Sequence, residues 1–235
     1  MSHVSPCFQQ NQFFVLVEYL TSLHEIYPVK HEFAGYPAAM ALADRVHSDH
    51  DIAPLEASKS YPDSIEKVLH FSGKARDIQE FERFLQQAQV ANIQNLLLLT
   101  GDKLKQHHNG RDGQLGSRYL ESVNAVMAAK QHGGFRIGVA FNPFKYVEAE
   151  RDAQYLKLHK KIKAGADFII TQLGYDIEAL KQAKSFLTKH DYSQQILACV
   201  MPLTLGRANF MVKHKLAGIV ITPHMLKVLG EEKQT

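Results

Sequence analysis

Seven short apolar runs recur along this chain of 235 residues, and they constrain its fold more than any other feature. Most of them are rich in Val, Ile, Leu and Phe and lack polar alternation, which is typical of parallel strands buried on both faces. The sequence therefore predicts a parallel sheet. The predicted strands are Phe13–Glu18, Ala38–Ala43, Val68–Ser72, Asn95–Thr100, Arg136–Phe141, Phe168–Gln172 and Ile196–Met201.

Amphipathic helix patterns lie between these runs. Apolar residues recur at intervals of three and four residues over 78–88, 120–127, 155–162 and 177–187. Asp77 and Glu80 stand in capping-box spacing before the first of these helices. Strands and helices thus alternate at a spacing of about 30 residues, as in successive βαβ units. No Gly-x-Gly-x-x-Gly motif follows a strand, so the sequence predicts an α/β fold of the (β/α)8 TIM-barrel type rather than a dinucleotide-binding open sheet.

The domain organisation follows from length and continuity. A chain of 235 residues fits one large core of the barrel kind, and no linker interrupts it. We expect a flexible polar leader over residues 1–12 and a single barrel domain over residues 13–235. The barrel has two ways to end: either Gly218–Thr222 supply an eighth strand, or the sheet is incomplete and stays open between its first and seventh strands.

The composition excludes several classes of protein. The chain has 27 Lys+Arg against 24 Asp+Glu, and a net charge of +3 is too small to predict a nucleic-acid-binding face. No apolar run approaches the ~18 residues of a membrane span, and no signal pattern is visible, so no membrane partner is expected. The two cysteines, Cys7 and Cys199, are too few for a disulfide framework, which favours a cytoplasmic protein.

Distinctive side chains stand at the carboxyl end of nearly every predicted strand. Because these ends meet at one mouth of a barrel, we expect the side chains to line a common pocket. Carboxylates, an imidazole and amides in such a pocket can transfer protons and hydrogen-bond a heterocycle. The residues are Glu18, Asp44, His70, Ser72, Thr100, Asp102, Phe141, Asn142, Gln172 and Met201.

Two other stretches have the composition of metal sites. They are HSDHD, with His47, His50 and Asp51, and QHHNGRDG, with His107 and His108. Their spacing fits neither a helical histidine pair nor a closed finger, so no metal site is predicted. The glycine-rich second stretch is better explained as a βα loop over the mouth of the barrel.

Several stretches match one known family in order and spacing. The most specific are LLLLTGD at 96–102 and AGADFIITQLGYD at 164–176. The others are FVLVEY at 14–19, LHFS at 69–72, IGVAFNP at 137–143, ILACVMPL at 196–203 and AGIVITPHMLKVL at 217–229. Together they resemble the methylenetetrahydrofolate reductase family over residues 13–229. The resemblance implies a (β/α)8 barrel that holds FAD at the carboxyl ends of its strands.

The resemblance also implies a reaction. Reduced FAD would pass a hydride to 5,10-methylenetetrahydrofolate, or to a related one-carbon pterin, and yield the 5-methyl form. Glu18 would be the acid that helps to open the bridging ring, Asp102 a catalytic carboxylate that also binds the pterin, and Gln172 a second pterin contact. The residues alone leave other roles open: Glu18 as a solvated or salt-bridged strand end, Asp102 as a turn residue, and Gln172 as an amide satisfied by backbone.

A further set of residues is implied to contact FAD. A helix predicted over Glu148–Lys163 would offer lysines to the FAD pyrophosphate as point charges, although such a run is as often a solvated helix face. A lone histidine on a strand is also often a satisfied core group. The implied FAD contacts are His70, Thr100, Gly101, Asp102, Phe141, Lys157, Lys160 and Lys161.

The resemblance therefore predicts a methylenetetrahydrofolate reductase-like oxidoreductase with FAD as cofactor and a tetrahydrofolate-type substrate. NAD(P)H or a protein is the expected electron donor, and a homo- or hetero-oligomer is the expected assembly. Two alternatives stay open. One is a flavin-free folate-binding or partner-dependent subunit, and the other is a folate-linked methyltransferase, which needs no flavin.

Overall fold

A computed structural model describes residues 6–8, 12–20, 31–46, 50–100, 119–214, 216 and 219–232 of the chain. Its internal contacts group into two compact units, Met1–Gly138 and Val139–Thr235, whose boundary falls within strand β6 (Arg136–Phe141). The sequence predicts a single domain over residues 13–235, so the strands and helices of that predicted domain are distributed over both units.

The first unit is built on a parallel sheet. Its strands are β1 (Val15–Tyr19), β3 (Tyr36–Leu42), β4 (Lys67–Ser72), β5 (Asn95–Leu99) and the start of β6, in that spatial order. Parallel pairing joins β1 to β3, β3 to β4 and β4 to β5. The Arg136 N–H donates to the Gln94 carbonyl at the start of β6. The two-residue strand β2 (Glu32–Phe33) forms an antiparallel hairpin with β3.

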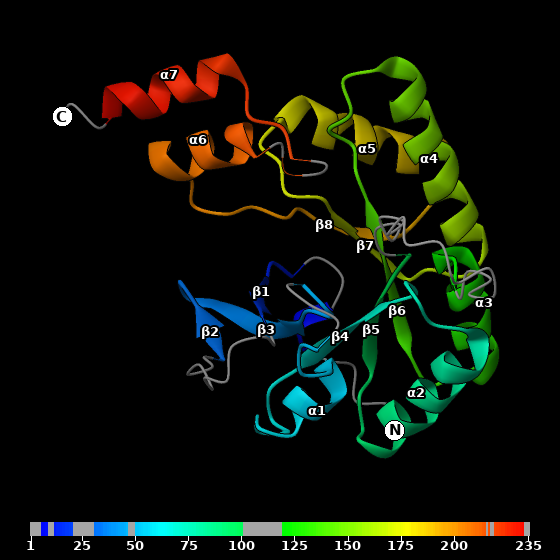
Figure 1. The fold of residues 1–235 in the computed structure, drawn as a ribbon. Helices are drawn as coiled ribbons and strands as arrows, with labels where there is room; N and C mark the ends of the chain where they lie inside the picture. The colour runs from blue at the N-terminus through cyan, green and yellow to red at the C-terminus, as the bar shows by residue number, and fades with distance from the viewer. Residues whose placement is uncertain are drawn as a thin grey trace, which may run out of the picture. The chain divides into compact units, whose positions relative to one another are not determined.

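Helices cover one face of this sheet. They are α1 (Pro54–Ser58), α2 (Ile78–Val90) and α3 (Ser122–His132), and Figure 1 shows α2 beside α3. The predicted capping box of α2 is confirmed. The Asp77 carboxylate accepts from the Glu80 N–H, and the Glu80 carboxylate accepts from the Asp77 N–H, each at 2.9 Å. These bonds satisfy two amide groups that a helix start leaves without partners.

The ring of Phe71 identifies the two faces of the first sheet. It packs on Phe81 and Phe84 of α2, with ring centroids 4.7 and 4.9 Å apart. Phe71 therefore faces the helices. Because side chains alternate along a strand, His70 and Ser72 lie on the opposite face, which in a (β/α) barrel is the interior.

The start of the chain contributes a short 3-10 helix, η1 (Pro6–Phe8), to the first unit. Cys7 and Phe8 are buried in it. Arg136 donates to the Phe8 carbonyl at 3.2 Å and lies over the Phe8 ring at 5.0 Å from its centroid. Three residues within the predicted flexible leader are thus packed against the fold.

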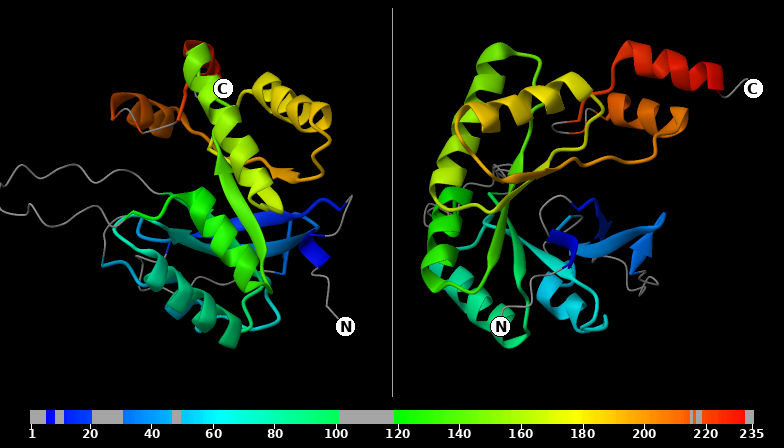
Figure 2. Two further views of the ribbon diagram at one scale, coloured as in Figure 1. Left: turned by 90° about the vertical axis from the view of Figure 1, so that its right-hand side faces the viewer. Right: turned by 180° about the vertical axis from the view of Figure 1, so that it is seen from behind.

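The second unit begins with the end of β6 and continues the alternation. It contains α4 (Glu148–Lys163), β7 (Phe168–Thr171), α5 (Ile177–Lys189), β8 (Gln195–Leu197), α6 (Leu205–Lys213) and α7 (Pro223–Glu232). Strand β7 pairs in parallel with β8. The rings of Tyr155 and Phe186 join α4 to α5 with centroids 4.8 Å apart. Figure 2 shows α6 and α7 packed side by side.

The predicted alternation of parallel strands and helices is confirmed, and the fold class is α/β. Two details differ at the carboxyl-terminal end. Strand β8 ends at Leu197 rather than at the predicted Met201, because the Cys199 N–H donates to the Thr171 hydroxyl at 3.0 Å instead of continuing a backbone ladder. Residues 219–222, most of the candidate eighth strand, form no strand and lead into α7.

Among the described residues, no helix is both long and apolar enough to cross a membrane.

Candidate active site

Glu18 and His70 lie on the same face of the first sheet. Glu18 pairs with Ala41, and Ala41 pairs with Val68, which stands two residues before His70 on β4. Residues paired across a sheet, or two apart in one strand, share a face. The register therefore places both Glu18 and His70 opposite the helices, with two strand spacings, about 10 Å, between β1 and β4.

The Glu18 carboxyl group has a raised pKa. Glu18 is an exposed residue of β1, yet partial desolvation by the surrounding protein still raises its pKa above the ordinary glutamate value. No residue in the described part of the chain forms an ion pair or hydrogen bond with it that would favour the charged form. A carboxyl group of this kind holds its proton to a higher pH, as a general acid must.

The His70 imidazole is buried, with 7% of the residue exposed. Burial lowers its pKa to about 4, so the ring is neutral near pH 7. Its Nε2 atom has no hydrogen-bond partner among the residues that the structure describes. A buried polar atom without a partner costs roughly 1–3 kcal/mol. Within the described residues, His70 therefore differs from a core histidine whose hydrogen bonds are all made.

Asp44 was predicted at the mouth of the barrel, but its carboxylate is engaged inside the fold. The side chain is 1% exposed. Arg76 holds it with two hydrogen bonds, Nη1 to Oδ2 at 2.7 Å and Nη2 to Oδ1 at 3.1 Å. The Ser72 N–H also donates to Oδ2 at 2.7 Å. Asp44 therefore joins the carboxyl ends of β3 and β4 and is not available to a ligand.

Thr100 lies directly after β5, and its hydroxyl group is engaged with α3. It accepts from the Ser122 N–H at 3.1 Å and lies 2.9 Å from the Ser122 hydroxyl. The hydroxyl thus satisfies an amide at the start of the helix. Two further predicted contacts, Gly101 and Asp102, lie outside the described residues.

In the second unit, Gln172 follows β7 directly. Its N–H donates to the Phe141 carbonyl at 2.8 Å, and its side-chain oxygen accepts from the Leu173 N–H at 2.9 Å. The backbone therefore satisfies the oxygen of the carboxamide. No hydrogen bond from its NH₂ group is found within the described ranges, which leaves that group as a donor for a ligand.

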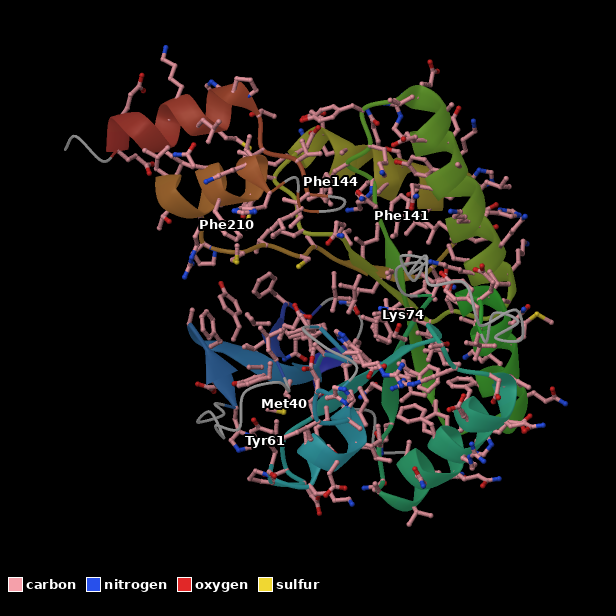
Figure 3. The ribbon with its side chains drawn as sticks, viewed as in Figure 1. Met40, Tyr61, Lys74, Phe141, Phe144 and Phe210 are labelled. Carbon is pink, nitrogen blue, oxygen red and sulfur yellow. The ribbon has the colours of Figure 1, made fainter. Side chains whose placement is uncertain are left out.

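Phe141 packs in the helix layer of the second unit. The residue is 3% exposed, and its ring meets Tyr155 of α4 edge-on with centroids 5.1 Å apart. Figure 3 labels Phe141 at the end of β6 and Phe144 on the segment that follows. Asn142, between them, accepts the Phe144 N–H at 3.0 Å through its side chain.

The lysines of α4 fall into two groups. Lys157 and Lys160 are exposed and stand three residues apart, so they share a face of the helix. Lys161 is half-buried and donates to the Ala140 carbonyl of β6 at 2.7 Å. Lys157 and Lys160 can therefore attract an anionic ligand, whereas Lys161 also fastens the helix to its strand.

Three contacts that the sequence did not indicate hold the carboxyl ends of β7 and β8. The Phe144 ring fills the space beside Gly174. The Tyr175 hydroxyl donates to the Met201 carbonyl at 2.8 Å, and the Gly174 N–H donates to the Cys199 carbonyl at 3.3 Å. Gly174, two residues after Gln172, was the available sequence signal for a close contact at this point. A sequence does not show, however, which side chain makes that contact.

The histidine-rich stretches do not assemble into a metal site where the structure describes them. No group of three or more His, Cys, Asp or Glu side chains there is arranged to hold a metal ion. His50 and Asp51 stand at a turn and a bend. His47, His107 and His108 lie outside the described residues.

Comparison with known proteins identifies the family. The family model of methylenetetrahydrofolate reductase matches residues 41–235. The chain belongs to the methylenetetrahydrofolate reductase family. "Methylenetetrahydrofolate reductase 2" of Saccharomyces cerevisiae is 29% identical over 165 residues, which cover 68% of this chain and 27% of the yeast protein. "Methylenetetrahydrofolate reductase 2" of Schizosaccharomyces pombe is 30% identical over 186 residues, which cover 72% of this chain and 28% of the Schizosaccharomyces pombe protein. The chain thus spans little more than a quarter of these reductases.

One solved structure shares the fold. It is a Clostridium thermocellum protein described as binding two copies of 5-methyl-5,6,7,8-tetrahydrofolic acid. The TM-score is 0.60 at 18% identity, and the match covers 82% of this chain and 63% of the other. The likeness supports the predicted TIM-type (β/α) barrel fold for this member of the reductase family.

Proposed function

We propose that the chain is an FAD-dependent reductase that converts 5,10-methylenetetrahydrofolate, or a related one-carbon pterin, to its 5-methyl form. One observation carries the proposal: in a chain of this family, Glu18 with its raised pKa shares a sheet face with the buried, neutral His70. FAD, when bound in its reduced form, supplies the hydride.

Glu18 is the proton donor in this proposal. Its carboxyl group keeps a proton to a higher pH than an ordinary glutamate does, because partial desolvation by the surrounding protein disfavours the carboxylate. The proton goes to the nitrogen of the bridging five-membered ring that leaves the methylene carbon. The ring opens to an iminium, and the hydride then adds to that carbon and gives the methyl group.

The residues present fit FAD at two points. The unpartnered Nε2 of buried His70 suits a hydrogen bond to an uncharged ring system such as flavin, since a neutral imidazole can either donate or accept. Lys157 and Lys160 are exposed on one face of α4, as a pair that meets a pyrophosphate must be. We assign His70 and these lysines to FAD on this basis, together with the residues implied by the family resemblance, Gly101 and Asp102.

The pterin is assigned to Gln172 and Asp102. Gln172 has its NH₂ group available and its oxygen occupied by the Leu173 N–H, so it donates to an acceptor on the pterin ring. A carboxylate such as that of Asp102 accepts from the N–H groups on the aminopyrimidinone edge. Gln172 then offers the pterin ring a hydrogen-bond donor and Asp102 offers it an acceptor, which matches a ring that carries groups of both kinds.

The absorbance spectrum of the purified chain after addition of FAD tests the proposal. Bound flavin gives visible absorbance that stays with the protein through gel filtration. Under anaerobic conditions a suitable donor, NADH, NADPH or a reductase protein, bleaches it, and 5,10-methylenetetrahydrofolate restores it with formation of the 5-methyl product. A chain that stays colourless with FAD contradicts the proposal.

A flavin-free folate-binding subunit is the second candidate, and two contacts favour it. The Thr100 hydroxyl is engaged with Ser122, and the Phe141 ring is buried against Tyr155, so two side chains implied to contact FAD are committed to the fold. This candidate binds 5-methyltetrahydrofolate with equal affinity in the presence and absence of FAD. Calorimetry of that binding, carried out with the colourless protein, separates it from the reductase.

A further inference from the structure

Two histidines from different helices stand close together in the second unit. His159 lies near the carboxyl end of α4, and His190 directly follows α5. Their ring centroids are 6.0 Å apart, and the ring planes meet at 70°. Figure 1 shows the two helices side by side, joined by the Tyr155–Phe186 contact. Because α4 and α5 lead into β7 and β8, the pair lies at the amino-terminal end of these strands, opposite the strand ends of the candidate active site.

Tyr192 holds the ring of His159. The Tyr192 hydroxyl group and the His159 Nδ1 atom form a hydrogen bond at 2.7 Å. Both residues are half-buried, whereas His190 is exposed. When Nδ1 donates this bond, the Nε2 atom of His159 keeps its lone pair. Histidines that bind metals are oriented in this way, with the second ring nitrogen hydrogen-bonded to a neighbouring group.

The His190 ring is held by packing. Its centroid lies 4.5 Å from that of Phe186 and 5.8 Å from that of Tyr192, and its plane is within 21° of the Tyr192 plane. In the part of the chain that the structure describes, its two ring nitrogens have no hydrogen-bond partner. His190 can therefore offer a nitrogen to a ligand without losing an existing hydrogen bond.

The separation of the two imidazole rings fits one shared metal ion. An imidazole nitrogen binds a divalent transition metal ion at about 2.0–2.1 Å, which places the ion about 3.2 Å from the ring centroid. Two imidazoles on one ion thus have centroids at most about 6.4 Å apart, and those of His159 and His190 are within this limit. No group of three or more His, Cys, Asp or Glu side chains among the described residues could hold an ion, so water would complete the coordination.

We propose that His159 and His190 together bind one divalent transition metal ion of the class that imidazole nitrogen prefers, Zn²⁺ or Cu²⁺, and that Tyr192 positions His159 for it. The bound ion links the carboxyl ends of α4 and α5. Lys163, whose ammonium group lies 5.6 Å from the Tyr192 ring centroid, repels the ion and limits the affinity. The site depends on neither FAD nor the reductase reaction.

Calorimetric titration of the full chain with Zn²⁺ tests the site. His190→Gln and His159→Gln should each lose one equivalent of Zn²⁺ that the parent chain binds. The double variant should lose no more than either single variant, because both histidines act on the same ion. Tyr192→Phe should keep the equivalent but weaken its binding by about 10- to 100-fold. His224→Gln, on the exposed surface of α7, is the matched control and should bind as the parent chain does.

Cu²⁺ at one equivalent is a second probe, which reports the ligands directly. The electron paramagnetic resonance spectrum of the parent chain should show coupling to two imidazole nitrogens, and that of each single variant to one fewer. Circular dichroism checks that each variant is folded. Equal Zn²⁺ binding by His190→Gln and the parent chain, or loss of two equivalents in the double variant, overturns the shared site. Unchanged affinity in Tyr192→Phe overturns the positioning role of Tyr192.

Discussion

The ring of Phe144 lies against the backbone of Gly174, in the space that a Cβ atom on residue 174 would occupy. This contact joins the segment after β6 to the segment after β7. It stands two residues from Gln172 and one from Tyr175, whose hydroxyl group holds the Met201 carbonyl. The contact thus fixes the backbone two residues after Gln172.

Gly174→Ala should destabilise the chain by about 1–3 kcal/mol, since the added methyl group overlaps the Phe144 ring and forces it to move. Urea denaturation measures the loss. Phe144→Leu in the same chain should recover part of the stability, because the smaller side chain leaves room for the methyl group. Gly206→Ala is the control, because a Cβ there meets no atom within 4 Å. Equal stability of Gly174→Ala and Gly206→Ala would contradict the packing described.

Asp44→Asn should cost about 3–5 kcal/mol of unfolding free energy. It leaves the half-buried Arg76 without the carboxylate that accepts two of its hydrogen bonds. Glu178→Gln breaks the exposed pair with Lys181 and should cost less than about 1 kcal/mol. Thermal or urea unfolding compares the two variants. Similar losses in both would mean that the Asp44 pair does not fasten the ends of β3 and β4.

His70 should make the stability of the chain depend on pH. Its pKa is lowered from 6.5 to about 4 by burial, so below pH 6.5 the unfolded chain binds a proton that the folded chain does not. Stability should therefore fall as the pH is lowered from about 6.5 to about 4. The two pKa values correspond to a loss of roughly 3 kcal/mol.

The variant His70→Leu should remove this contribution, which a urea titration at several pH values would measure. His224→Gln changes an exposed histidine of α7 and serves as the control, with the pH dependence of the parent chain expected to remain. A parallel pH dependence in His70→Leu and the parent chain would show that the folded protein does not keep His70 neutral.

Thr100→Val should destabilise the start of α3 by about 1 kcal/mol, because it removes the hydroxyl group that accepts the Ser122 N–H but keeps the shape of the side chain. Hydrogen exchange of the first amides of α3 would report the effect locally. Unchanged protection there would argue that the hydroxyl group is available for another role, such as the flavin contact that the family resemblance implies.

The alternation of strands and helices was readable from the sequence because it depends on local patterns. Helix α4 has the predicted bounds Glu148–Lys163, and the capping box of α2 forms as expected. The direction of strand-end side chains was not readable. An uninterrupted apolar run has no period of two, so it does not indicate that Phe141 faces a helix or that Thr100 reaches Ser122.

Long-range partners were also beyond the sequence. Asp44 and Arg76 are 32 residues apart, and only the parallel pairing of β3 with β4 brings them together. Together with the pairing of β1 and β3, it also places Glu18 and His70 on one face. Desolvation by the surrounding protein, which raises the pKa of Glu18 and lowers that of His70, is likewise a property of the folded chain.

The rate at which 5,10-methylenetetrahydrofolate reoxidises the reduced, FAD-loaded protein in a single turnover tests the central claim most directly. Glu18→Gln keeps the shape of the side chain but cannot donate the proton, and it should bind FAD normally while slowing reoxidation by about 100-fold or more. In the parent chain the rate should fall as the pH rises through the raised pKa of Glu18. Glu32→Gln, an exposed residue of β2, should leave the rate unchanged. Equal rates in Glu18→Gln and the parent chain would contradict the assignment of Glu18 as the proton donor.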